Sequence, residues 1–146
     1  MSNKPFEYLL VTVQFSTLAY LFLATNWMMM PAWALAGLAI SFLLAVWAIG
    51  IMQFSNLKVT PSPGESAQLR MNGPYKLIRH PMYSSLLIAA AFLIIPQYSL
   101  IRLIMGLLLT VDLIVKLNYE EKLLQQKFNT YRAYIEKTYR LIPYIY

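Results

Sequence analysis

Two polar stretches that border long apolar runs hold ionisable side chains whose types could take part in chemistry. In the first, GPYKLIRHPMY (residues 73–83), an arginine and the only histidine of the chain directly precede a proline. In the second, NYEEKLLQQKF (residues 118–128), Glu120 and Glu121 are adjacent. Bases in one stretch and acids in the other are suited to binding a zwitterion or a cationic cofactor between them.

A purely structural interpretation of the same residues is also open. Arg79 can extend along apolar surface to lipid headgroups, Tyr75 and Tyr83 can form an interfacial aromatic belt, and the two glutamates can be solvated helix residues. Cysteine is absent and histidine occurs once, so neither a disulfide nor a metal site is expected.

The composition indicates a membrane protein. Of 146 residues, 59% are hydrophobic and only 12% are charged, whereas an ordinary soluble domain has about 25% charged residues. The net charge of +6 comes from basic residues separated by apolar runs. Membrane topology therefore explains it better than binding to nucleic acid, and no nucleic-acid partner is expected.

Four apolar segments predict an all-α integral membrane protein, with about four transmembrane helices in a single domain, residues 1–146. The hydrocarbon core takes about 20 apolar residues to cross, and the third segment is short for this. The first lacks a basic flank and a cleavage site, so it is expected to be retained. The expected spans are residues 6–24, 32–54, 83–95 and 99–117.

The remaining residues predict a polar face on one side of the membrane. Residues 118–138 are expected to form a cytoplasmic amphipathic helix, because apolar residues recur there near helical spacing. With four spans, both termini, the loop 55–82 and the segment 118–146 share one side, which then holds eleven of the twelve Lys and Arg residues. The positive-inside rule makes this side cytoplasmic. We therefore predict a protein of the cytoplasmic (inner) membrane, with its site facing the cytoplasm.

The polar residues near the third and fourth spans are placed to position a site. Pro81 prevents His80 from continuing a helix and suits the first turn of the next one. Asp112, Lys116 and Glu120 follow one another at steps of four, so they share one helix face. An acid and a base within a span indicate either a functional face or a pair near the interface that neutralises itself.

The two polar stretches together resemble the integral-membrane methyltransferases of the isoprenylcysteine carboxyl methyltransferase and phospholipid methyltransferase group. The resemblance covers residues 55–144, and two positions depart from the pattern, Asn129 and Tyr139. The residues that carry it are Gly73, Tyr75, Arg79, His80, Pro81, Tyr83, Glu120, Glu121, Phe128, Tyr131, Tyr134, Arg140 and Pro143.

The resemblance implies an enzyme that uses S-adenosylmethionine, releases S-adenosylhomocysteine, and binds this cofactor between the loop 55–82 and the segment 118–146. Arginine and histidine suit its carboxylate, glutamate its ammonium or ribose, and tyrosine rings its adenine or sulfonium. The implied cofactor-binding residues are Tyr75, Arg79, His80, Pro81, Tyr83, Glu120, Glu121, Tyr131 and Tyr134. The predicted catalytic residues are Arg79, Arg140 and Glu121, and one of the two arginines is expected to hold the acceptor.

The acceptor is predicted to be lipophilic, a small molecule or prenylated substrate that enters from the bilayer. A carboxylate is ionised at pH 7 and needs no base, and its reaction with a sulfonium neutralises charge, which an apolar pocket favours. An amine, as in phosphatidylethanolamine, must first lose a proton, which gives His80 or a glutamate a second task. We therefore favour O-methylation of an isoprenylcysteine-like carboxylate, with phospholipid or amine N-methylation as the alternative.

Two other function classes stay open. A sterol-reductase-like, NADPH-dependent membrane reductase is one, because such proteins have somewhat similar C-terminal halves. A noncatalytic lipid-binding membrane protein is the other. It would keep an arginine, a histidine and paired glutamates at a membrane face for packing alone, where such residues are expensive.

Overall fold

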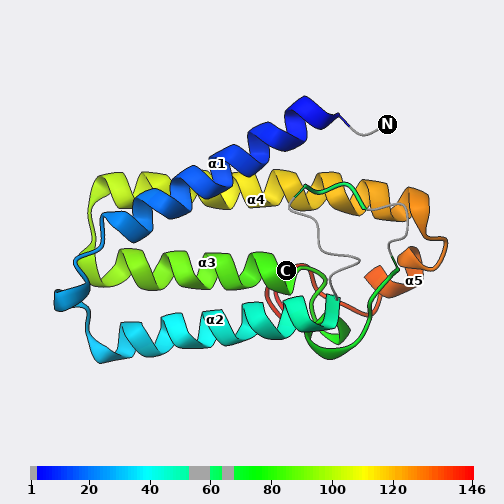
Figure 1. The fold of residues 1–146 in the computed structure, drawn as a ribbon. Coiled ribbons are helices and arrows are strands. Elements are labelled where there is room, and N and C mark those ends of the chain that lie inside the picture. The colour runs from blue at the N-terminus through cyan, green and yellow to red at the C-terminus, as the bar shows by residue number, and fades with distance from the viewer. Residues whose placement is uncertain (1–2, 53–59, 64–67) are drawn as a thin grey trace.

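The computed structural model describes residues 3–52, 60–63 and 68–146, and every regular element within them is helical. Four long helices run alternately up and down beside one another, and a short helix follows (Figure 1). The elements are α1 (Lys4–Leu23), α2 (Ala32–Met52), α3 (Pro81–Ile94), α4 (Leu100–Lys127) and α5 (Tyr131–Ile135), with 3-10 turns at Trp27–Met29, Gly73–Lys76 and Ile95–Gln97. The predicted all-α class is confirmed.

Three of the long helices begin at residues suited to an N-terminus. The Asn3 side chain accepts a hydrogen bond from the Phe6 N–H at 3.4 Å and caps α1. Ser99 caps α4 in the same way, by accepting from the Arg102 N–H at 3.3 Å. Pro81 is the first residue of α3, where its missing N–H leaves no helical bond unmade. The prediction that Pro81 opens the third helix is confirmed.

The helices pack in two pairs joined through α3. Helix α1 packs mainly on α4, α2 packs on α3, and α3 also contacts α4. Helices α1 and α2 are consecutive in the chain, yet each packs mainly on a different partner. The buried core lies where α1, α3 and α4 meet, and it consists of Leu21, Ala90, Leu93, Ile94, Leu109 and Leu113.

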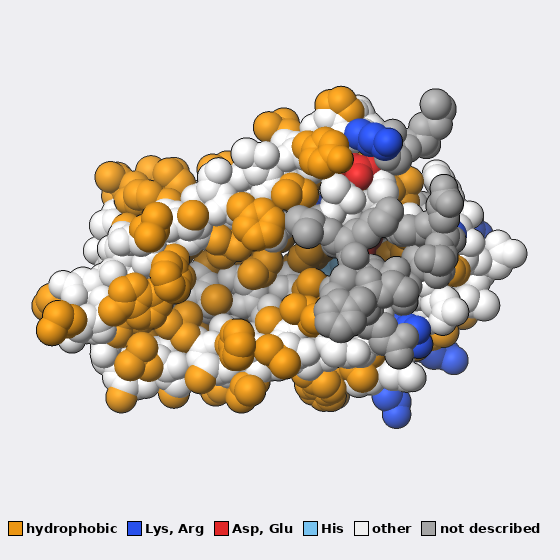
Figure 2. Space-filling model, viewed as in Figure 1, with side chains coloured by type: hydrophobic (Ala, Val, Ile, Leu, Met, Phe, Trp, Pro, Cys, Tyr) orange, Lys and Arg blue, Asp and Glu red, His pale blue; other side chains and the backbone are white. Residues whose placement is uncertain are grey.

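Most of the bundle's outer surface is apolar, and its charges gather at one end. Figure 2 shows hydrophobic side chains along the helices, whereas the visible Lys and Arg side chains lie at the end that holds the N-terminus. Within the described residues, α1 and α2 are the helices long and apolar enough to cross a membrane, and the apolar helical stretch 81–97 is shorter. At 1.5 Å per residue, 20 residues reach about 30 Å, the thickness of a hydrocarbon core.

The structure corrects the expected amphipathic helix over residues 118–138. Helix α4 continues without a break to Lys127, Phe128 is extended, and α5 covers only five residues. Asn129 and Thr130 are weaker helix formers than the residues before them. The buried side chains of Tyr131 and Tyr134 then hold the chain against the bundle. Of the predicted loop, residues 55–59 (with Lys58) and 64–67 lie outside the described residues, as do residues 53 and 54 of the second predicted span.

The end of the bundle opposite the two termini is closed around a buried arginine. Arg102, 5% exposed, donates from Nη1 to the Leu93 carbonyl at 2.7 Å and from Nη2 to the Ala24 carbonyl. These carbonyls belong to the last turns of α3 and α1, where helices leave acceptors without a partner in their own backbone. Arg102 therefore ties two helix ends to α4.

Candidate functional site

The C-terminal tail is fastened to the residues that lead into α3. The Arg79 N–H donates to the Tyr139 carbonyl at 2.7 Å, and the His80 N–H donates to the Arg140 carbonyl at 3.1 Å. An isolated parallel bridge joins Ile78 and Tyr139. This backbone pairing brings two segments that are far apart in the sequence into register, as the predicted meeting of the two polar stretches requires.

A turn before α3 sets the direction of this segment. Gly73 has φ +57°, in the left-handed region, and a Cβ at this position would lie 2.8 Å from Cγ1 of Ile51 in α2. Glycine is the residue that tolerates both constraints. The 3-10 turn Gly73–Lys76 therefore lies beside the end of α2.

Glu121 is surrounded by three basic side chains. Its Oε1 lies 2.7 Å from Nε of Arg79 and 3.4 Å from Nε2 of His80, and its Oε2 lies 3.3 Å from Nη2 of Arg140. Burial raises the pKa of Glu121, but hydrogen bonds and positive charge from His80 and Arg79 outweigh it and lower the pKa to about 2. Glu121 is therefore ionised and holds the two polar segments together.

The guanidinium of Arg79 is largely engaged by the protein itself. Besides Glu121, it donates from Nη1 to the Ile135 carbonyl at 3.2 Å and to the Thr138 hydroxyl at 3.3 Å, and also to the Thr138 carbonyl. Arg79 is 8% exposed. This burial contradicts the interpretation that it extends to lipid headgroups, and its bonds fasten the residues after α5.

Glu120, the neighbour of Glu121, makes a separate set of contacts. Its Oε2 accepts a hydrogen bond from the Tyr83 hydroxyl at 2.7 Å and lies 3.7 Å from Nδ1 of His80. The His80 and Tyr83 rings are parallel, with centroids 5.3 Å apart. Histidine, tyrosine and glutamate thus form one packed group at the start of α3.

Three buried tyrosines lie near this group, and the hydroxyls of two of them have no hydrogen-bond partner among the described residues. The Tyr134 hydroxyl donates to the Tyr75 carbonyl at 2.6 Å. Those of Tyr75 and Tyr131 make no hydrogen bond to any described residue. Burial and the nearby glutamates raise the pKa of both, and burial, against the charge of Arg79, raises the pKa of Tyr134 to about 12. All three phenols are neutral at pH 7 and can donate.

These groups border a cavity of about 460 Å³. Seven predicted site residues line it: Tyr75, Arg79, His80, Tyr83, Glu120, Tyr131 and Tyr134. Three others, Pro81, Glu121 and Arg140, are not among its lining residues. Glu121 and Arg140 lie behind the wall, so their predicted catalytic roles stay predictions, and their contacts are those of positioning residues.

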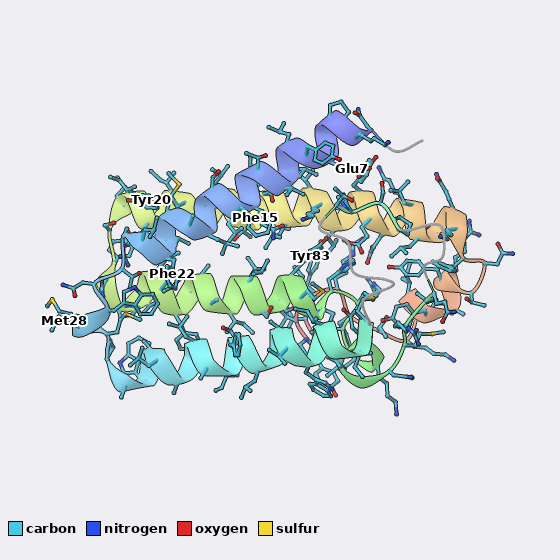
Figure 3. The ribbon with its side chains drawn as sticks, in the orientation of Figure 1. Glu7, Phe15, Tyr20, Phe22, Met28 and Tyr83 are labelled. Carbon is cyan, nitrogen blue, oxygen red and sulfur yellow. The ribbon has the colours of Figure 1, made fainter. Side chains whose placement is uncertain are left out.

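The other side of the cavity comes from residues that the sequence did not single out. Gln14, Phe15 and Leu18 of α1 line it, together with Ala45 and Ile49 of α2. Figure 3 shows Phe15 of α1 and Tyr83 of α3 reaching toward the space between their helices. Gln14 is one of the few polar residues in the first apolar run, and this signal could have drawn attention to α1.

A buried acid on α1 holds a further part of the wall in place. Glu7, 3% exposed, accepts hydrogen bonds from the Ser62 hydroxyl and, at 3.2 Å, from the Tyr119 hydroxyl. Thr60, Pro61, Ser62 and Pro63 all line the cavity. Glu7 therefore links this short stretch to α1 and α4.

An apolar groove adjoins the cavity. The groove has a volume of about 670 Å³ and is lined by residues of α1, the following connection, α2 and α3. Phe15 and Leu18 line both the cavity and the groove. These two side chains therefore stand between the polar group at the start of α3 and the apolar groove.

One comparison with known proteins bears on this site. The model of the family described as phospholipid methyltransferase matches residues 27–131, which is more than half of the 146 residues. The match includes α2, α3 and α4, and with them His80, Tyr83 and Glu120. No curated protein matches the chain.

Proposed function

Because the chain belongs to the phospholipid methyltransferase family of membrane methyltransferases, we propose that it transfers a methyl group from S-adenosylmethionine to a lipophilic acceptor. The observation that carries this proposal is the cavity, which is lined by a glutamate, a histidine and tyrosines as well as by apolar side chains of α1 and α2. Such a cavity suits two ligands of opposite character that meet inside it.

The polar end fits S-adenosylmethionine. The unpaired hydroxyls of Tyr75 and Tyr131 and the carboxylate of Glu120 are available to its polar groups. His80 would hold or balance its carboxylate, and the tyrosine rings offer faces for adenine or the sulfonium, at about 0.5–2 kcal/mol for a cation–π contact. When bound, this cofactor supplies an electrophilic methyl group on a positively charged sulfur.

The apolar end fits the tail of a lipid-like acceptor. Phe15 and Leu18 would contact the tail inside the cavity, and the groove between α1 and α2 would admit it from the bilayer. We favour a carboxylate acceptor of the isoprenylcysteine kind. A carboxylate is ionised at pH 7, so the site has to orient it and exclude water but has to remove no proton.

N-methylation of a phospholipid amine is the second candidate, and one contact favours it. Glu120 accepts from Tyr83 and lies near His80, so a carboxylate stands where it could take the proton that an ammonium acceptor must lose. The family match favours either methyl transfer over the reductase and the noncatalytic lipid-binding protein.

We further propose that α3 and α4 cross the membrane together with α1 and α2. The charged residues of α4 within the span 99–117 are Arg102, Asp112 and Lys116, all 5% exposed or less, whereas its outward residues are exposed and apolar. Both termini would then face the cytoplasm. Cysteines introduced at Asn3 and at Tyr146 should be labelled from the cytoplasmic side in both cases, and labelling from opposite sides would contradict this topology.

The function is tested by transfer of a labelled methyl group from S-adenosylmethionine to a synthetic S-prenylcysteine or to phosphatidylethanolamine. Wild-type protein should methylate one of them, and His80→Ala and Glu120→Gln should each reduce the rate at least about tenfold. Lys76→Gln is the matched control, because Lys76 is exposed and does not line the cavity.

A second measurement separates the remaining functions. S-adenosylhomocysteine, the product, should raise the melting temperature of the purified protein, whereas NADPH should not. Stabilisation by NADPH alone would favour the reductase, and stabilisation by neither, with no transfer to either acceptor, would refute the proposal.

A further inference from the structure

Lys116 is a buried base in the wall of the cavity. It is 2% exposed, and its Nζ donates to Oε1 of Gln14 at 2.6 Å and lies 5.6 Å from the centre of the Tyr83 ring. Lys116, Gln14 and Tyr83 all line the cavity. An ammonium in such a place is expensive unless an anion or several acceptors surround it.

Among the described residues, no carboxylate forms an ion pair with this ammonium. Asp112 lies one helical turn earlier on the same face of α4, but among the described residues no ion pair joins the two side chains. Oδ2 of Asp112 is buried and has no hydrogen-bond partner among them. Asp112 and Lys116 therefore form no contact ion pair, although each favours the charge of the other over a longer distance, and their interpretation as a self-neutralising pair stays a prediction. Lys116 is directed to Gln14 and to the cavity.

Its position along the cavity lies between the polar and the apolar lining residues. Glu120 is one turn further along α4, about 6 Å away along the helix axis, and there it joins Tyr83 and His80. Gln14 is followed on α1 by Phe15 and Leu18, which lead into the apolar groove. A lipid whose tail lies along Phe15 and Leu18 would bring its head group to Lys116.

We propose that Lys116 binds the anionic group of the acceptor lipid, with Gln14 orienting the ammonium. The inference rests on the proposed function and narrows its substrate class to lipophilic molecules that carry a negative charge beside the methylated atom. A carboxylate acceptor would supply this charge itself. A phospholipid amine would supply it through its phosphodiester, so the shared chemistry is a lipid-borne oxyanion.

Binding of matched ligands tests the proposal without turnover. The probes are a fluorescent N-acyl S-prenylcysteine and its carboxamide, which differs by one charge. Wild-type protein should bind the carboxylate at least about tenfold more tightly than the carboxamide. Lys116→Gln should abolish this preference, Lys116→Arg should keep most of it, and Lys76→Gln should behave as wild type.

A second variant keeps the proposal testable if Lys116→Gln fails to fold. Gln14→Glu keeps Lys116 but puts a carboxylate beside its ammonium, so the ligand's carboxylate should lose its advantage as well. Competition by lysophosphatidylethanolamine forms the other arm. If Lys116→Gln weakens binding of lysophosphatidylethanolamine but not of the prenylcysteine, the oxyanion that Lys116 binds is a phosphodiester. That result would support the role of Lys116.

Three results would overturn the role of Lys116. The first is an unchanged carboxylate preference in Lys116→Gln together with unchanged competition by lysophosphatidylethanolamine. The second is equal weakening of carboxylate and carboxamide binding in that variant. The third is a wild type that neither prefers the carboxylate nor binds lysophosphatidylethanolamine. Affinity for S-adenosylhomocysteine, measured in parallel, should stay within about twofold in all these variants. Because wild-type binding of S-adenosylhomocysteine is read separately, failure of the methyltransferase function and failure of the anion site are distinguishable.

Discussion

Two buried arginines, at opposite ends of the bundle, have different kinds of partners. Arg102 donates to backbone carbonyls at the ends of α1 and α3, and the nearby connections are joined by Gln97 and Asn26, which exchange hydrogen bonds of 2.9 and 2.7 Å. Arg79 binds Glu121 and the C-terminal tail, beside tyrosine hydroxyls without partners. Both are less than 9% exposed, so burial of a charge does not by itself distinguish them.

The difference lies in what remains unsatisfied around each arginine. At the Arg102 end, the charge completes bonds that helix ends would otherwise lack. At the Arg79 end, the hydroxyls of Tyr75 and Tyr131 and the ammonium of Lys116 line a cavity and can form further hydrogen bonds with a ligand. A ligand site therefore differs from a purely structural contact in that some of its polar side chains line a cavity and can form further hydrogen bonds.

The largest expected effect is on stability at the Arg102 end. Arg102→Met should destabilise the fold by about 1–3 kcal/mol or more, because the buried Leu93 carbonyl loses its partner and the part-buried bond to the Ala24 carbonyl is lost as well. Thermal unfolding in detergent measures this loss. At temperatures where the variant is folded, its affinity for S-adenosylhomocysteine should equal that of the wild type. A loss of affinity there would break the distinction between the two ends.

An isosteric change that removes one charge at the cavity should lower ligand affinity more than stability. Glu120→Gln should lower the affinity for S-adenosylhomocysteine by about tenfold or more, because a charge-assisted hydrogen bond is worth about 1.5–3 kcal/mol. Isothermal titration calorimetry measures this affinity. Glu121→Gln is the paired variant. It should mainly lower the melting temperature, because Glu121 binds Arg79, His80 and Arg140 and does not line the cavity. The opposite pattern would reverse the roles assigned to the two glutamates.

Acid should weaken the Arg79 end. The pKa of Glu121 falls from 4.5 to about 2 in the folded state, so its stabilisation is present above pH 4.5 and is lost as the pH falls toward 2. Unfolding in detergent between pH 6 and pH 3 should show a loss of about 1–3 kcal/mol in the wild type. In Glu121→Gln this part of the pH dependence should disappear. An identical pH profile in both proteins would contradict the assignment.

The smallest effects are expected from the unpaired hydroxyls. Tyr75→Phe and Tyr131→Phe should leave the melting temperature unchanged, because each removes a hydroxyl that has no partner among the described residues. Each variant should lower the affinity for S-adenosylhomocysteine by about two- to tenfold. Tyr134→Phe is the matched control, since its hydroxyl already bonds the Tyr75 carbonyl. It should lose about 1 kcal/mol of stability. Unchanged affinity in both of the first two variants would mean that those hydroxyls do not face the ligand.

Much of the fold could be predicted, because its cause is local. Runs of apolar residues indicate the helices, and residues that favour a helix N-terminus, Asn3, Pro81 and Ser99, precede or open three of them. The end of α4 was missed, because the spacing of apolar residues continues past Phe128 while the chain turns. A repeat of apolar residues marks a buried face but carries no information about a bend within it.

Part of the site could be predicted as well, through the two motifs and their resemblance to a family. That His80 and the paired glutamates meet follows from their placement on one side of the bundle. Which glutamate faces the cavity does not, because consecutive residues on a helix point about 100° apart, and the rotation of α4 is set by its packing on α1 and α3.

The sequence alone determined the helical class, the position of most helix starts and the identity of the reactive groups, since each depends on neighbouring residues. Tertiary structure decided that Glu120 lines the cavity while Glu121 lies behind it, and that Lys116 contacts Gln14, 102 positions away. It also decided that α1 and α2 pack on different partners with a groove between them. These facts depend on how whole helices rotate and pack, because no local pattern couples residues so far apart.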